Sequence, residues 1–160
     1  MKPDSHPYAP MIPLKTRNLA VIRQRSMGLS CVIVSPDGRV TDCVGRGVSD
    51  LYRILTEEPS ILRGAFVADK VIGKGAAALR SAGGVRWVHA GVISSPALSL
   101  FRSADVLVSY DDEVPNIINR AGTGICPVES LCADCQTAAE CVPLIGGFLA
   151  GMKSEHRDRP

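Results

Sequence analysis

Four of the six cysteines fall within sixteen residues, at Cys126, Cys132, Cys135 and Cys141, with the spacing C-x5-C-x2-C-x5-C. Thiolate sulfur is the usual ligand of iron–sulfur clusters and a common ligand of zinc. Four thiols so close in sequence predict a metal site, with a [4Fe–4S] cluster slightly favoured over a zinc ion. A reducible dithiol, or a grouping without function, is the alternative that the spacing leaves open.

Cys126 has a second interpretation. It precedes Pro127, an order typical of a helix N-cap followed by a proline in the first turn. A helix N-terminus favours negative charge, so a Cys126 thiolate could act as a nucleophile. Alternatively, Cys126 is a small capping residue, and Glu129 is only a carboxylate of the first helical turn.

The segment directly before Cys126 is typical of a ligand-binding loop. An arginine in it can hold an anion through two hydrogen bonds, and its glycines allow the backbone to approach a ligand closely. We therefore expect a substrate-binding loop that contains Asn119, Arg120, Gly122, Thr123 and Gly124.

Two predicted strands end in polar residues that could complete this site. Ligands bind beyond the carboxyl ends of parallel strands, where free N–H groups at helix N-termini attract phosphate or carboxylate. The glycines there could instead serve tight packing, and Lys74 could be a solvated surface residue. The catalytic candidates are Asp69 as acid or base, Lys70 and Lys74 as charge stabilisers, and Cys126, while Gly73, Ser94 and Ser95 are candidates for substrate binding.

The composition is that of a globular protein and excludes several classes. The chain has 160 residues, a formal net charge of +2 and only 4% aromatic residues, which argues against nucleic-acid binding. Prolines interrupt the first fifteen residues, and no apolar run approaches the roughly 18 residues of a membrane span. We expect a cytoplasmic protein, in which clustered cysteines indicate metal or redox chemistry.

These residues must be positioned by alternating strands and helices. A β-rich run, the turn Pro36-Asp37-Gly38 and a returning strand predict a hairpin over residues 29–44. Further strands are predicted over 64–68, 85–93 and 106–110, with helices between and after them. We expect a flexible proline-rich arm over residues 1–15, one domain over 16–153 with its cysteine-rich segment at 126–141, and a polar tail over 154–160.

Four segments occur in order between Leu29 and Glu129: 68–70 (ADK), 73–74 (GK), 90–94 (AGVIS) and 119–129 (NRAGTGICPVE). Together they resemble an uncharacterised domain-of-unknown-function family that has the cytidine-deaminase-like fold but lacks the deaminase zinc motif. The resemblance implies a three-layer α/β/α fold with a mixed sheet of about five strands that begins with a hairpin. It implies no established reaction, and Val128 stands where the family would have a methionine.

A zinc deaminase needs an H-x-E motif and a P-C-x-x-C motif. No histidine of this chain is followed by x-Glu, so we expect no zinc at the deaminase position. Two functions remain in competition: a domain that binds or transforms a small anionic or nucleotide-like metabolite, as a hydrolase or transferase, and a metal-binding or redox-sensing module built on the cysteines. A scaffold or dimerisation domain, forming a homo-oligomer, is the third alternative.

Overall fold

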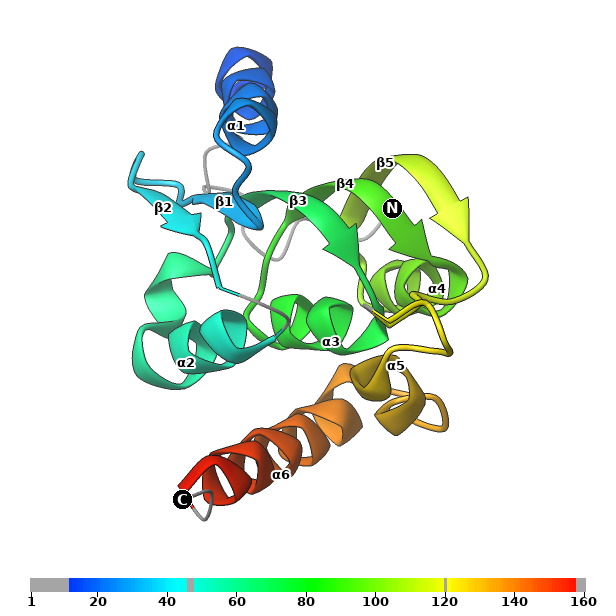
Figure 1. The fold of residues 1–160 in the computed structure, drawn as a ribbon. Coiled ribbons are helices and arrows are strands. Elements are labelled where there is room, and N and C mark those ends of the chain that lie inside the picture. Colours follow the sequence, from blue (N-terminus) through cyan, green and yellow to red (C-terminus); the bar gives the residue numbers. More distant parts are fainter. Residues whose placement is uncertain (1–11, 46–47, 120, 158–160) are drawn as a thin grey trace.

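Five strands form one mixed sheet at the centre of the molecule, shown in Figure 1. The structure is a computed structural model that describes residues 12–45, 48–119 and 121–157, without the side chains of 153–157. The sheet order is β2-β1-β3-β4-β5, with β1 antiparallel to both neighbours and β3, β4 and β5 parallel. The predicted mixed α/β architecture is confirmed. The strands are β1 (Cys31–Val34), β2 (Val40–Cys43), β3 (Phe66–Ile72), β4 (Trp87–Ser94) and β5 (Leu107–Val114).

The sheet begins with the predicted hairpin. Its turn has Gly38 at φ +92°, in the left-handed region that glycine adopts without strain. The Arg39 N–H donates to the Asp37 carboxylate at 2.9 Å, and the Ser35 N–H donates to the Arg39 carbonyl at 2.9 Å. The turn therefore fixes the register in which Cys31 lies opposite Cys43.

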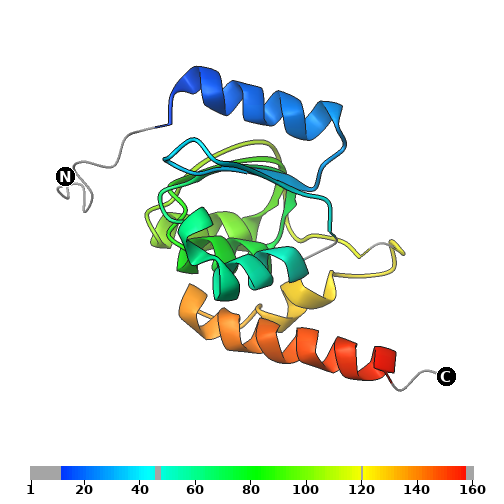
Figure 2. The ribbon, with the colours of Figure 1, turned by 90° about the vertical axis from the view of Figure 1, so that its left-hand side faces the viewer.

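Helices cover the sheet in layers. One helix, α1 (Leu14–Ser26), lies on one face, and α2 (Ser49–Glu57), α3 (Lys74–Ala82) and α4 (Ser95–Ser103) lie on the other, as Figure 2 shows. A short 3-10 helix, η1 (Pro59–Ile61), follows α2. Beyond α3, a further layer contains α5 (Pro127–Leu131) and α6 (Ala138–Arg157).

Helix α3 lies between the sheet and α6, which explains its small residues. Ala77 and Ala78 are fully buried, and a Cβ added to Gly75 would lie 2.3 Å from Val128 Cγ1 of α5. Because α3 is covered on both sides, its charged residues Lys74 and Arg80 are buried as well. These two cations are central to the sites described below.

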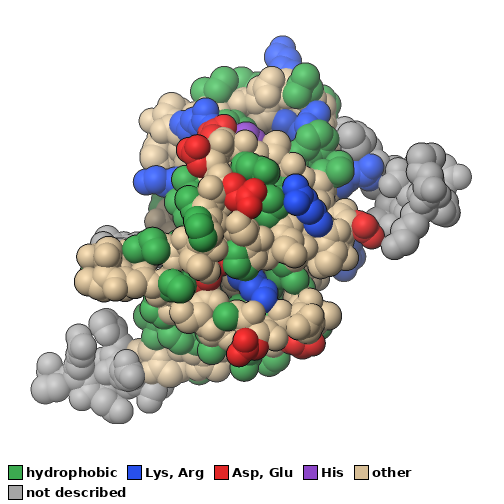
Figure 3. Space-filling model, turned by 90° about the vertical axis from the view of Figure 1, so that its right-hand side faces the viewer, with side chains coloured by type: hydrophobic (Ala, Val, Ile, Leu, Met, Phe, Trp, Pro, Cys, Tyr) green, Lys and Arg blue, Asp and Glu red, His purple; other side chains and the backbone are tan. Residues whose placement is uncertain are grey.

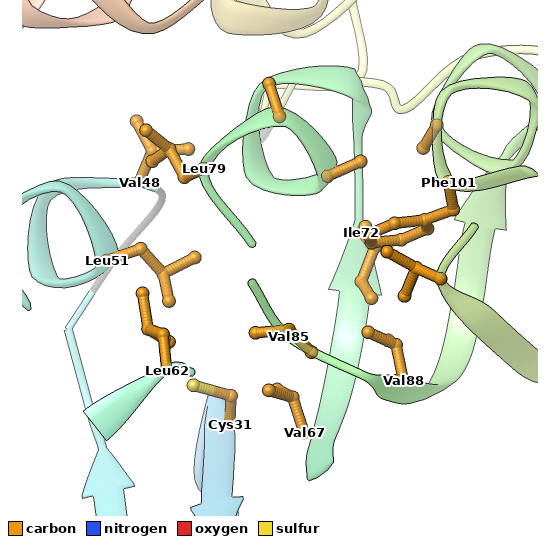
Figure 4. Packing of buried hydrophobic residues seen from close by; sticks show 14 of the residues in the cluster. Cys31, Val48, Leu51, Leu62, Val67, Ile72, Leu79, Val85, Val88 and Phe101 are labelled. Carbon is orange, nitrogen blue, oxygen red and sulfur yellow. The ribbon is translucent and has the colours of Figure 1, made fainter. Parts of the chain in front are cut away.

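Two apolar cores hold the layers together. The larger one lies between the sheet and α2, α3 and α4, and Figure 4 shows Cys31 and Val67 of the sheet packed there with Leu62. The smaller core joins α1 to the opposite face through Ala20 and Phe66. Side chains that alternate along β3 therefore enter different cores.

Several boundaries differ from the sequence predictions. Strand β3 continues to Ile72 rather than ending at residue 68, so Asp69 and Lys70 lie within the strand and not beyond its end. Helix α1 begins at Leu14, within the range predicted as an arm. Strand β5 continues to Val114 rather than ending near residue 110, although most of it is exposed. The second half of β5 reads Asp111-Asp112-Glu113, a charged sequence that propensity alone does not assign to a strand. Its pairing with β4 forms it instead.

Candidate functional site

The N-terminus of α3, where we predicted an anionic ligand, is occupied by the carboxylate of Glu129. Its Oε1 accepts hydrogen bonds from the Lys74 N–H at 2.9 Å and from the Ser94 hydroxyl at 2.6 Å. Its Oε2 accepts from the Ile117 N–H. Glu129 is buried, so the protein supplies its own anion to these donors.

The lysines next to this point have separate roles. Lys74 is 8% exposed, and its Nζ donates to the carbonyls of Ala133 at 3.1 Å and Cys135 at 2.6 Å. It therefore holds the loop between α5 and α6 rather than a ligand. Lys70 is exposed. Because side chains alternate along a strand, Lys70 projects from the opposite sheet face to its neighbour Asp69.

Asp69, the predicted acid or base, is buried in an ion pair with Arg80 of α3. The Asp69 carboxylate also accepts the Val71 N–H at 3.2 Å. Burial raises the pKa of Asp69, while the neighbouring Arg80 charge and two backbone hydrogen bonds act to lower it. The structure thus places Asp69 in the core under the hairpin, away from Glu129 and its donors.

The predicted substrate loop is closed by its own hydrogen bonds. The Asn119 side chain accepts the Thr123 N–H at 3.0 Å and donates to the Thr123 hydroxyl at 3.1 Å. Gly122 adopts φ +71°, which the turn requires.

Two other candidates for substrate binding are Ser95 and Arg120. The Ser95 hydroxyl donates to the Glu113 carboxylate at 2.6 Å. Arg120, the predicted anion clamp, lies outside the described residues.

Packing, rather than ligand access, accounts for the first glycine of α3. A Cβ at Gly73 would lie 3.3 Å from Ile117 Cγ1 and 3.6 Å from the Glu129 carboxyl group. The absence of a side chain lets the segment that carries Ile117 approach the helix. The candidate Gly124 has open space instead.

Three of the four clustered cysteines come together where α5 meets α6. We call Cys132, Cys135 and Cys141 the thiol trio. Cys132 and Cys141 lie in one buried cluster with Cys135 packed against it, and both neighbours raise the pKa of Cys141. Cys132 and Cys141 are fully buried, whereas Cys135 is partly exposed. The C-x-x-C turn places the first two sulfurs, and the first turn of α6 brings the third to them.

Capping interactions fix the geometry of the thiol trio. The Glu140 N–H donates to the Thr137 hydroxyl at 3.3 Å, and the Glu140 carboxylate accepts the Gln136 N–H at 3.0 Å. This reciprocal capping starts α6 in the register that places Cys141 one turn after Thr137, whose carbonyl accepts the Cys141 thiol at 3.5 Å. The Lys74 ammonium group donates to the Cys135 carbonyl and so holds the same loop against α3.

The buried thiols are held in the protonated form. Burial raises the pKa of Cys141 well above its ordinary value, and the hydrogen bonds and charges of Cys135 and Cys132 raise it further. Burial also raises the pKa of Cys132, while the hydrogen bond with Cys141 and the charge of Lys74 act in the opposite direction. Cys141 is therefore the hydrogen-bond donor at the centre of the group.

The predicted four-thiolate metal site is not supported by this arrangement. Within the described ranges, no set of three or more His, Cys, Asp or Glu side chains is placed so that it could hold a metal ion. Cys126 occupies the N-cap position of α5, at the opposite end of that helix from Cys132, and is not among the groups that act on Cys132 or Cys141. The three remaining cysteines pack in one cluster as free thiols.

The best-defined hollows lie away from the predicted substrate residues. The larger is a wide groove of about 580 Å³, and the smaller, at the α1 face, holds only about 10 Å³. The larger groove is formed by the ends of α3 and α4 and the start of α6, and its lining includes Leu100, Ser103, Gln136 and Thr137.

The face on the β5 side mixes acidic, basic and apolar side chains and has no large patch of one charge sign, as Figure 3 shows.

The sequence did not predict the interactions of two charged residues, Arg80 and Glu129. Arg80 has the sequence context of a surface arginine at the end of an alanine-rich helix, and only the packing of α3 on the sheet brings it to Asp69 and buries it. Glu129 was interpreted as a first-turn carboxylate of its own helix. It serves the first turn of α3 instead, 55 residues away. The C-P-x-E pattern marks a helix start but does not reveal which helix the carboxylate reaches.

The fold and site define a mixed α/β protein with a cysteine-bearing helical layer outside its sheet. The chain belongs to the family described as domain of unknown function DUF1893 (TM1506), whose model matches residues 21–149. Among curated proteins, none matches the chain.

A solved structure supports the same assignment. The chain is similar to a DUF1893 family protein (TM1506) from Thermotoga maritima, solved at 2.70 Å resolution, with 25% identity and a TM-score of 0.79. The similarity covers 88% of this chain and 95% of that protein. In the described part of this chain, no helix is both long and apolar enough to cross a membrane.

Proposed function

We propose that this protein is a thiol–disulfide redox protein whose reactive group is the thiol trio. The supporting observation is that Cys132 and Cys141 are buried in one cluster with Cys135 packed against it, and that Cys132 and Cys135 both raise the pKa of Cys141. Thiols in such contact need little rearrangement to form a disulfide in either pairing. Cys135 is the partly exposed member, so an external disulfide meets it first.

The reaction proceeds by two thiol–disulfide exchanges. The Cys135 thiolate attacks one sulfur of a small disulfide, a new S–S bond forms, and the first small thiolate leaves. Cys141 then loses its proton, attacks the Cys135 sulfur and releases the second small thiolate. Two protein thiols are thereby oxidised and the external disulfide is reduced to two thiols.

The third thiol extends this chemistry inward. Cys132 is fully buried in the same cluster as Cys141. Attack of the Cys132 thiolate on Cys141 would transfer the disulfide to Cys132–Cys141 and return Cys135 to the thiol form. The partly exposed thiol could then react again, while the oxidised pair stays buried.

The alternative function, binding or transformation of a small anionic metabolite, has less support. Glu129, Lys74 and Ser94 satisfy one another or nearby backbone groups, and Asp69 is paired with Arg80. These groups therefore need no ligand to complete their hydrogen bonds. Redox chemistry uses the predicted cysteines, three of which pack together as free thiols.

We propose in addition that the fold is the cytidine-deaminase-like fold that the sequence resembles. The sheet order β2-β1-β3-β4-β5, with the hairpin at one edge and helices on both faces, supports this proposal. At the start of α2 the chain has Ser49 and Asp50, and at the start of α3 it has Gly73 and Lys74. Neither pair contains the histidine or cysteines of a zinc deaminase.

The test is oxidation of the reduced protein by oxidised glutathione, followed by alkylation and peptide mapping. We expect a disulfide within the thiol trio, and Cys141→Ser should instead accumulate glutathione on Cys135. The matched control, Cys126→Ser, should behave as the parent protein because Cys126 lies outside the trio.

Elemental analysis of the same reduced protein separates redox chemistry from metal binding. Stoichiometric zinc or iron that is lost in Cys132→Ser would overturn the redox proposal in favour of a metal site. Visible absorbance near about 400 nm would identify the metal centre as an iron–sulfur cluster.

A further inference from the structure

A second pair of thiols is carried by the two strands of the hairpin, in a different layer from the thiol trio. Cys31 of β1 and Cys43 of β2 are direct cross-strand partners, and both are buried, at 3% and 5% exposure. Each thiol acts on the pKa of the other. We call Cys31 and Cys43 the hairpin pair.

The hairpin pair continues into a row of functional groups across three strands. Cys31 pairs in register with Cys43 on one side and with Asp69 of β3 on the other. Arg80 of α3 reaches this row through its ion pair with Asp69. The charge of Arg80 acts on both thiols and lowers the pKa of each.

Arg80 is not satisfied by its one partner. The side chain is 1% exposed, and its Nε and Nη1 have no hydrogen-bond partner among the described residues. Buried polar groups are nearly always paired, because an unpaired donor loses its hydration without compensation. A buried guanidinium with two free donors therefore indicates that an acceptor or a negative charge belongs beside it.

The surrounding charges favour the thiolate on Cys43. The hydrogen bond from Cys31 lowers the pKa of Cys43, burial and the nearby Asp50 oppose this, and Arg80 adds to the lowering. The same hydrogen bond, followed by burial and the charge of Asp69, raises the pKa of Cys31. One thiol of the pair is thus prepared as a nucleophile and the other as its protonated neighbour.

We propose that the hairpin pair is a peroxide-reactive site, in which Cys43 reduces a hydroperoxide and Cys31 then closes a disulfide with it. Arg80 is a positioning residue that stabilises the negative charge at Cys43. This site goes beyond the proposed function, because it uses other residues, another oxidant and another part of the fold.

Two steps complete the reaction. The Cys43 thiolate attacks the terminal oxygen of the hydroperoxide, the O–O bond breaks, and the sulfur becomes a sulfenic acid while an alkoxide or hydroxide leaves and takes up a proton. The Cys31 sulfur then attacks the Cys43 sulfur. The S–S bond forms, and the hydroxyl group leaves with the Cys31 proton as water.

The position of Cys43 gives a small oxidant a route to it. Strand β2 is a four-residue edge strand whose partner is β1, and Val40 at its start is 51% exposed. Short edge strands open locally at much lower free energy than the core. Opening of β2 exposes Cys43 while Asp69 and Arg80 stay in place on β3 and α3.

The experiment treats the reduced full-length protein with hydrogen peroxide and maps disulfides by mass spectrometry after alkylation under native conditions. We expect a peptide pair joined through Cys31 and Cys43. In Cys31→Ser, we expect a sulfenic acid on Cys43 that dimedone traps, and in Cys43→Ser we expect loss of both products.

A variant with Cys132, Cys135 and Cys141 replaced by serine separates this site from the proposed function. Peroxide should still join Cys31 to Cys43 in this variant, whereas glutathione disulfide should no longer produce a protein disulfide. Hairpin thiols that stay unmodified in the parent protein, while peroxide oxidises only the trio, would overturn the proposal and leave the redox function intact.

The contribution of Arg80 is measured in Arg80→Gln. Loss of the cation should slow dimedone labelling of Cys43 in the Cys31→Ser background roughly tenfold, the change in thiolate fraction for one pKa unit. It should also move the pH dependence of labelling to higher pH. An unchanged rate and pH profile in a folded variant would remove Arg80 from the site, and native-state mapping of the parent protein tests the pair if this variant fails to fold.

Discussion

At the scale of single residues, buried charges stabilise the structure by pairing with each other rather than by binding a ligand. Asp69 and Arg80 illustrate this, since each would be an uncompensated charge in the core without the other. The residue types and their order in the sequence identified Asp69 as unusual. They could not identify its partner, because Arg80 reaches Asp69 only when α3 packs on the sheet.

The ion pair predicts a large effect on stability. Asp69→Asn leaves the Arg80 guanidinium buried without a counter-charge, and we expect the free energy of unfolding to fall by about 3–5 kcal/mol. Chemical denaturation measures this difference. The control is Asp42→Asn, which removes an exposed partner of Arg23 and should change stability little. Equal effects of the two substitutions would contradict the role assigned to the buried pair.

The thiol trio predicts a dependence of stability on alkaline pH. Folding raises the pKa of Cys141 above its ordinary value of 9.0, so the folded state retains a proton that the unfolded chain releases. This contribution is fully present below pH 9 and is lost as the pH rises further. The melting temperature of the parent protein should therefore fall more steeply above pH 9 than that of Cys141→Ser. Parallel curves of melting temperature against pH would show that folding does not raise the pKa of Cys141.

At the scale of secondary-structure elements, local sequence patterns predicted turns and helices, but they did not predict contacts between distant segments. The hairpin turn was predicted from Pro36-Asp37-Gly38 and is observed, with Gly38 at φ +92°. The Ser94 hydroxyl caps α4 by accepting the Ala97 N–H at 3.2 Å. The predicted anion site at α3 depends on Glu129, which reaches it only through the packing of α5 on α3. No local pattern encodes that contact.

Glu129 predicts how α3, α5 and the segment before α5 are coupled. Glu129→Gln replaces one acceptor oxygen with an amide that faces an N–H donor, so at least one buried hydrogen bond is lost. We expect a loss of about 2 kcal/mol in the free energy of unfolding. The exposed Glu113→Gln should cost less than about 0.5 kcal/mol. Full stability of Glu129→Gln, together with binding of an added anion at α3, would restore the ligand-site interpretation.

At the scale of the whole molecule, the two groups of thiols lie in separate layers. The hairpin pair is carried by β1 and β2 of the sheet, and the thiol trio lies where α5 meets α6, in the layer beyond α3. Helix α3 separates them and directs one cation to each, Arg80 to the hairpin and Lys74 to the trio. Sequence spacing found the trio because its members are neighbours in the chain. It does not reveal a site at Cys31 and Cys43, because their charged neighbours come from distant segments.

The redox equilibrium of the thiol trio tests the central claim most directly. The reduced protein would be equilibrated in glutathione buffers of increasing potential, and the fraction of disulfide in the trio would be measured after acid quenching. We predict a two-electron transition with a midpoint between about −300 and −180 mV, which is absent in Cys141→Ser. A trio that stays fully reduced in the most oxidising buffer would contradict the account.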